Sequence, residues 1–96
     1  MNKKDFKNRN DDLFNAVLKL ETAEEAKAFF EDLCTWTELE AISQRYQIAV
    51  SLSRGLNYNE ILEQIGTSSA TISRVNRSLK NGAGGYEIVL SRLADK

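Results

Sequence analysis

The chain has 96 residues, of which 42% are hydrophobic and 28% charged, and its formal net charge is −1. This composition is ordinary for a soluble globular domain and excludes a wholly disordered chain. A single domain of this size buries only about 60–65% of its unfolded surface, so a core shared with a second copy would help to stabilise it.

Several classes of function are excluded by the residues that are missing. No apolar run approaches roughly 18 residues and no charged-then-apolar leader is present, so we expect neither a membrane span nor a signal peptide. The chain has no histidine and one cysteine, Cys34, which excludes the usual zinc sites and catalytic triads. We therefore expect no enzyme, no metal and no cofactor, and the single cysteine indicates a reducing cytoplasm.

The first third of the chain is predicted to contain two helices. Residues 1–10 are polar and are expected to fray, and apolar spacing predicts a helix over about residues 11–20. A second helix is predicted to start at Thr22, because Thr22 to Glu25 fit the capping-box pattern of a hydroxyl residue followed three positions later by a glutamate.

The third predicted helix is the longest. Residues 37–40 fit a second capping box, which places the start at Thr37, and Gly55 is predicted to end the helix. Its predicted inner face consists of Leu39, Ile42, Tyr46, Ala49 and Val50.

Three short helices are predicted to follow, over about residues 59–65, 69–80 and 86–93. The first two are separated by Gly66-Thr67-Ser68, and the glycine-rich residues 81–85 precede the last. No segment alternates with a period of two, so the predicted fold is all-α.

The pair of helices around Gly66 fits a helix-turn-helix. Such a turn needs a residue that tolerates positive φ, with apolar residues at fixed distances on either side. Ile61, Ile65, Ile72 and Val75 occupy those positions. An ordinary corner between two helices would fit this apolar spacing equally well.

The polar side of the second helix favours DNA contact over an ordinary corner. Ala70, Ser73, Arg74 and Arg77 lie opposite Ile72 and Val75 at helical spacing, and no acidic residue occurs between Gln64 and Gly85. Residues 51–96 carry a net charge of +2 and residues 1–50 carry −3, so the basic bias is local. The predicted DNA contacts are Asn59, Thr67, Ser68, Ser69, Ala70, Thr71, Ser73, Arg74, Arg77 and Lys80.

These residues resemble the DNA-binding unit of the Trp repressor superfamily, and in particular its bacterial Trp repressor-like branch. The similarity is carried by residues 56–66, by Ala-Thr-Ile-Ser-Arg at 70–74 and by Ser-Leu-Lys at 78–80. Upstream, Thr35, Glu38 to Ala41, Arg45 and Arg54-Gly55 fit the same pattern, so the strong match covers roughly residues 33–80.

The resemblance implies one domain over residues 1–96 with six helices, folded as an intertwined homodimer. The helix-turn-helix would span about residues 57–80, and residues 11–54 and 86–94 would form the dimer. The implied function is a transcriptional regulator, a repressor, that binds double-stranded operator DNA. The alternative is a helical protein-interaction module that keeps the fold without specific DNA binding.

The resemblance also implies a site for a small-molecule corepressor. The positions that match the tryptophan-binding set of the family are Thr35, Arg45, Arg74, Val75 and Ser78. Alternatively, Arg45 and Arg74 form surface ion pairs with Glu38, Glu40 or Glu63.

Two residues depart from the family pattern. Val75 stands where tryptophan sensors have glycine beside the indole, which predicts that tryptophan is rejected in favour of a different effector or none. Leu62 stands where the family offers a lysine to phosphate, which predicts weaker or differently aimed DNA binding.

Overall fold

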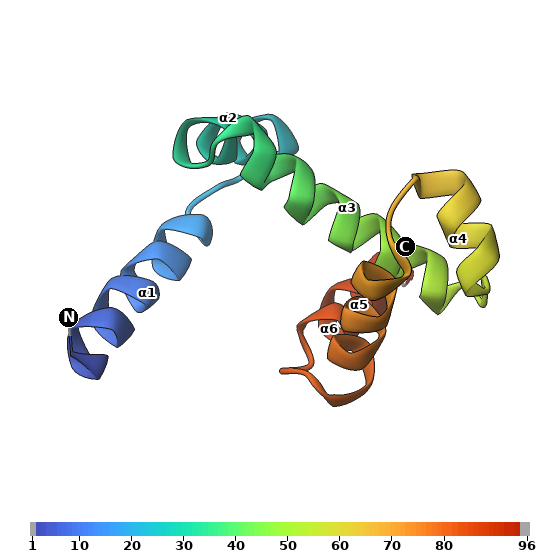
Figure 1. Cartoon of the computed structure of the whole chain (residues 1–96). Helices are drawn as coiled ribbons and strands as arrows, with labels where there is room; N and C mark the ends of the chain where they lie inside the picture. Colours follow the sequence, from blue (N-terminus) through green and yellow to red (C-terminus); the bar gives the residue numbers. More distant parts are fainter. Residues whose placement is uncertain (1, 95–96) are drawn as a thin grey trace. The chain divides into compact units, whose positions relative to one another are not determined.

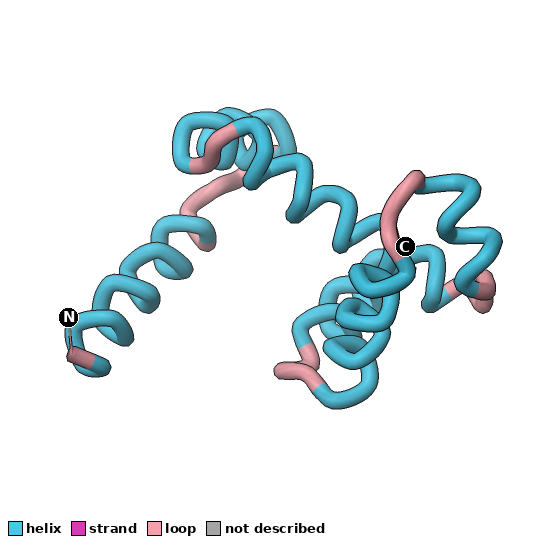
Figure 2. Tube along the Cα trace, in the orientation of Figure 1, coloured by secondary structure: helices cyan, strands magenta, loops and turns pink. Residues whose placement is uncertain are grey.

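Six helices and no strand make up residues 2–94, the part of the chain that the computed structural model describes (Figures 1 and 2). The helices are α1 (Lys3–Val17), α2 (Ala23–Leu33), α3 (Trp36–Ser53), α4 (Tyr58–Ile65), α5 (Ser69–Asn81) and α6 (Gly85–Ala94). The all-α prediction is confirmed. None of these helices is long and apolar enough to cross a membrane. Residue 1 and residues 95–96, the ends of the predicted domain, lie outside the described residues.

The chain divides into two compact units, residues 1–39 and 40–96, which we call the N-terminal and C-terminal units. The boundary falls early in α3, so this helix begins in the first unit and has most of its length in the second. Each unit is described below by itself.

The start of α1 differs from the prediction. The segment that was expected to fray is helical from Lys3, because the Asn2 side chain caps the helix by accepting a hydrogen bond from the Asp5 backbone N–H at 2.9 Å. The helix ends at Val17 rather than near residue 20. Apolar spacing missed this start because the first ten residues are almost entirely polar.

The capping boxes place the starts of α2 and α3. Thr22 caps α2 as predicted, accepting from the Glu25 N–H at 3.1 Å. The predicted start of the third helix at Thr37 is wrong by one residue, and its cap is Thr35, whose hydroxyl accepts from the Glu38 N–H at 3.1 Å. Residues 35–38 and 37–40 both fit the capping-box pattern, so the pattern alone does not choose between them.

The C-terminal unit contains the buried core, which consists of Ile48, Ala49, Ile61, Ile72 and Val75. The predicted inner face of the third helix was partly wrong: Ala49 is buried, but Ile42 is 41% exposed and Ile48, absent from that prediction, is fully buried. Gly55 follows the end of α3 with φ +86°, as expected for a helix-ending glycine. Tyr86 of α6 packs against the core, which gives this short helix its anchor.

Candidate nucleic-acid interface

The first helix of the predicted pair, α4, has a well-capped start. The Asn57 side chain accepts from the Glu60 N–H, and the Glu60 carboxylate accepts from the Asn57 N–H, both at 2.9 Å. This reciprocal box satisfies two of the amide groups that a helix start leaves without partners. An eight-residue helix has little stability of its own, so the cap and the packing of Ile61 hold it together.

A single left-handed residue turns the chain between α4 and α5. Gly66 has φ +71° and ψ +39°, and its N–H donates to the Leu62 carbonyl at 3.1 Å. A Cβ at this position would meet no atom within 4 Å, so the glycine is required by the backbone conformation rather than by space. The next cap follows at once, because Ser68 accepts from the Thr71 N–H at 3.2 Å and starts α5.

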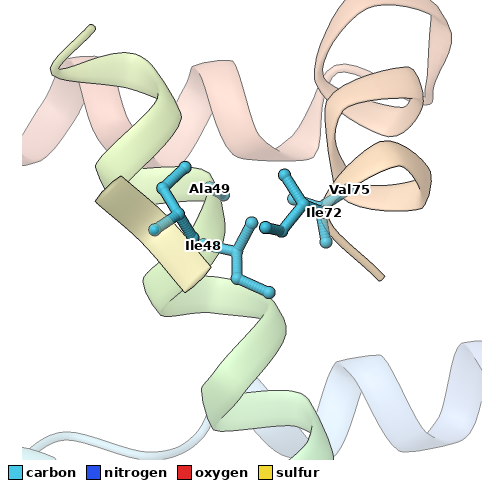
Figure 3. Close-up of a cluster of buried hydrophobic side chains, with 5 residues drawn as sticks. Ile48, Ala49, Ile72 and Val75 are labelled. Atoms are coloured by element: carbon cyan, nitrogen blue, oxygen red, sulfur yellow. The ribbon is translucent and has the colours of Figure 1, made fainter. Parts of the chain in front are cut away.

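The buried sides of α4 and α5 both pack against α3. Figure 3 shows Ile72 and Val75 of α5 directed toward Ile48 and Ala49 of α3, and Ile61 of α4 belongs to the same cluster. Ile61, Ile72 and Val75 are three of the four residues that the helix-turn-helix spacing predicted to be apolar and inward. The fourth, Ile65, is half-buried and packs against the cluster.

The opposite side of α5 is exposed and basic. The residues that the structure leaves exposed there and just before it are Ser68, Ser69, Ala70, Ser73, Arg74, Arg77 and Lys80, and Asn59 is exposed on α4. Small side chains lie near the start of α5 and cations toward its end. This is the distribution that lets a helix backbone approach bases while arginines and lysine reach phosphates.

Two of the predicted DNA contacts, Thr67 and Thr71, are partly buried. The Thr67 hydroxyl oxygen is buried without a hydrogen-bond partner within residues 2–94, so it faces protein rather than solvent. Thr71 is half-buried, and its hydroxyl shares a 2.9 Å hydrogen bond with the Ser68 hydroxyl. Thr71 therefore takes part in the cap of α5, and the contact of both threonines with DNA stays a prediction.

The residues of the predicted effector site have different environments. The Thr35 hydroxyl caps α3, Val75 is only 2% exposed in the core, Arg45 is half-buried, and Arg74 and Ser78 are exposed. The Thr35 backbone N–H donates to the Glu38 carboxylate at 2.8 Å, and this bond, followed by the Thr35 hydroxyl, lowers the pKa of Glu38.

The alternative role of the two arginines, as ion-pair partners of nearby glutamates, is not seen in the C-terminal unit. Neither Arg45 nor Arg74 forms a salt bridge there within residues 40–94. The ion pair that the described residues do contain is Lys27–Glu31, one turn apart in α2.

One contact within the helix pair was not anticipated. The Asn76 side-chain amide donates to the Tyr58 hydroxyl at 3.4 Å, joining the middle of α5 to the start of α4. The separation of 18 residues gives no periodic signal in the sequence, although an asparagine on an inward-facing helix edge does suggest an unidentified polar partner.

Comparisons with known proteins agree with this geometry. The family model described as Trp repressor protein matches residues 8–94. The chain is 44% identical over 85 residues to protein YerC of Bacillus subtilis (strain 168), a match that covers 88% of this chain and 82% of YerC.

Two crystal structures are similar over most of their length. A Trp repressor candidate from Staphylococcus aureus matches with a TM-score of 0.85 and 44% identity, over 92% of this chain and 88% of that one. A TrpR-like protein from Eubacterium eligens ATCC 27750 matches with a TM-score of 0.83 and 48% identity, over 88% and 87% of the two chains.

Proposed function

The chain belongs to the Trp repressor family of helix-turn-helix regulators, and we propose that it binds one operator sequence in double-stranded DNA as a homodimer and represses transcription there. The observation that carries the proposal is the exposed side of α5. Arg74, Arg77 and Lys80 lie there without an acidic residue between Gln64 and Tyr86 to repel phosphate. Such a helix can enter the major groove with its cations against the backbone.

Within this proposal the exposed residues take different roles. Ala70 and Ser73 lie early on α5 and are small, so they approach base edges and select sequence. Arg77 and Lys80 lie late on the helix and contact phosphate, which fixes position without selecting sequence. Leu62 on α4 is half-buried against the core and offers no charge, so phosphate contact comes mainly from α5.

The homodimer is supported by apolar side chains that the chain does not cover. Trp36 is 77% exposed and Leu18 is 80% exposed, and Phe6, Phe14 and Leu33 are also exposed in the N-terminal unit. Large apolar side chains exposed in this number on a small protein favour an interaction surface. A two-fold dimer would present two copies of α5, so the bound sequence should be a near-palindrome with half-sites about one helical turn apart.

A protein-interaction module is the second candidate, and one observation favours it. Ile88, Val89 and Leu93 of α6 are each about half exposed, which gives the C-terminal unit an apolar surface besides the basic one. In the proposed dimer this surface faces the second copy. In the alternative it binds another protein, and the basic side of α5 selects no DNA.

Selection of bound sequences from random double-stranded DNA tests the proposal. We expect the purified protein to enrich one near-palindromic sequence. Enrichment of no sequence, or of sequences without two-fold symmetry, would contradict it and leave the interaction module as the better interpretation.

Replacement of Arg77 tests the orientation of α5. We expect Arg77→Ala to weaken binding to all DNA about equally and to lower the slope of log Kd against log salt by about 0.9 for each phosphate that the side chain neutralised. Arg92→Ala on α6 is the matched control, because it removes an exposed arginine that belongs to neither helix of the helix-turn-helix. If Arg77→Ala kept the affinity and the salt slope of the unchanged protein, the proposed orientation of α5 on DNA would be wrong.

A further inference from the structure

The inner side of α5 is filled by side chains of the protein itself. Ile72 and Val75 lie about one turn apart, are 0% and 2% exposed, and meet Ile48 and Ala49 of α3 (Figure 3). The fully buried side chains of residues 2–94 are all apolar, so the contact between α5 and α3 is made by apolar side chains. Close-packed apolar contacts tolerate little movement, because any shift opens voids on one side.

Further contacts hold α5 to α4. The Gly66 turn is closed by its hydrogen bond to Leu62, and the long Asn76–Tyr58 hydrogen bond joins the two helices farther along. Tyr58 also packs against the core, and this packing fixes the position of the ring that bears the hydroxyl. The helix pair is thus held at its turn, at its inner side and at its edge.

A hollow in the surface of the C-terminal unit is formed without α5. It has a volume of about 540 Å³ and is lined mostly by polar residues of α3 and α4, such as Gln44 and Gln64, and by Arg54 directly after α3. None of its lining residues comes from α5. A molecule bound in this hollow would therefore contact neither Ile72 nor Val75.

We propose that the protein's own contacts, chiefly those of Ile72 and Val75, hold α5 in its DNA-contacting position. Operator binding then requires no small effector. This inference rests on the proposed function and specifies its regulation. A ligand changes DNA affinity only when it binds one arrangement of the protein better than another. The close packing of Ile72 and Val75 opposes displacement of α5, so a ligand would gain little by binding a displaced arrangement.

The first test uses the unmodified protein, freed of bound small molecules by unfolding in denaturant, dialysis and refolding. We expect the stripped protein to bind its selected operator with the same Kd as the protein before stripping. Addition of the twenty amino acids at millimolar concentration, L-tryptophan included, should leave that Kd unchanged. Loss of specific binding on stripping, or a gain of about tenfold or more on addition, would overturn the inference.

A second measurement does not depend on an operator. Hydrogen exchange of the stripped protein without DNA should show the α5 amides protected as strongly as those in the buried part of α3. Rapid exchange throughout residues 72–80 would overturn the inference. Failure to enrich any DNA would instead count against the proposed function, and the exchange result would still decide whether α5 is held.

A pair of valine variants separates positioning from general stability. Val75→Ala should lower specific affinity about tenfold, with non-specific affinity and the salt slope unchanged because every charge is retained. Val50→Ala is the matched control, since Val50 lies half-buried in the same unit at the hollow rather than under α5. Equal specific affinities of the two variants, measured well below their melting temperatures, would show that Val75 does not position the helix.

Discussion

The two units of this chain differ in how completely they bury their apolar side chains. The C-terminal unit buries Ile48, Ile61 and Ile72 completely, whereas no residue among residues 2–39 is fully buried. Phe29 and Phe30 of the N-terminal unit are half-buried and pack edge to face, with ring centroids 5.6 Å apart. One unit therefore builds a core from its own residues, and the other presents most of its apolar surface outward.

The difference indicates which unit the second copy of the proposed dimer would complete. The 15-residue α1 has no buried residue, and Phe6 and Phe14 are more than half exposed. An isolated helix of this length is marginal in water. We infer that the N-terminal unit is completed by the second copy, while the helix-turn-helix is organised within one chain.

The largest expected effect comes from dissociating the proposed dimer. We expect an obligate dimer, so that dilution below the dissociation range removes the helical signal of the N-terminal unit. Sedimentation at micromolar concentration, with Trp36 fluorescence as the local signal, measures this. A folded monomer with Trp36 still in an apolar environment would contradict the inference that the N-terminal unit is completed by a second copy.

The next effect tests the core of the C-terminal unit. Ile72→Ala should lower the free energy of unfolding by about 2–5 kcal/mol, because it removes a fully buried side chain and leaves a cavity. Urea unfolding measures the loss, and Ser73→Ala, at the adjacent exposed position, serves as control. A cost no greater than that of the control would mean that this core is not the source of stability.

Tryptophan binding would sharpen the comparison, because the predicted effector residues are distributed over both units. Val75 carries about three more carbons than glycine, and overpacking of that size costs roughly 1–3 kcal/mol. We expect tryptophan affinity to fall by one or two orders of magnitude below that of a glycine-bearing site, or to vanish. Calorimetry with L-tryptophan measures this, and micromolar binding would show that the backbone makes room.

The smallest effect is on the start of α3. The pKa of Glu38 is lowered below its ordinary 4.5 by the hydrogen bonds of Thr35, so the capping box contributes stability above that pH. The contribution should be lost as the pH falls through the lowered pKa of the folded state. The Thr35 amide signal in NMR reports the change, and Glu38→Gln should abolish its acid dependence. An acid transition that persists in Glu38→Gln would assign it to another carboxylate.

Much of the fold could be predicted because its signals are local. Thr22, Gly66 and the apolar spacing of Ile61, Ile72 and Val75 each act through neighbours within a few residues, so caps, turn and inward face were visible without coordinates. The exposure of Ala70, Ser73, Arg74 and Arg77 was predictable in the same way, because it follows from helical spacing once Ile72 faces inward; their contact with DNA stays a prediction. Asn2 carried the same kind of local signal for α1, but the polar segment after it concealed the start.

What the sequence left open were choices among equivalent surfaces. Apolar residues lie on more than one side of α3, and spacing did not reveal that Ile48 packs under α5 while Ile42 stays exposed. The Asn76–Tyr58 contact and the inward-facing Thr67 hydroxyl likewise arise only when α4 and α5 are folded together. Periodicity is a property of one helix, whereas burial depends on which other helix covers it, and only the tertiary structure decides that pairing.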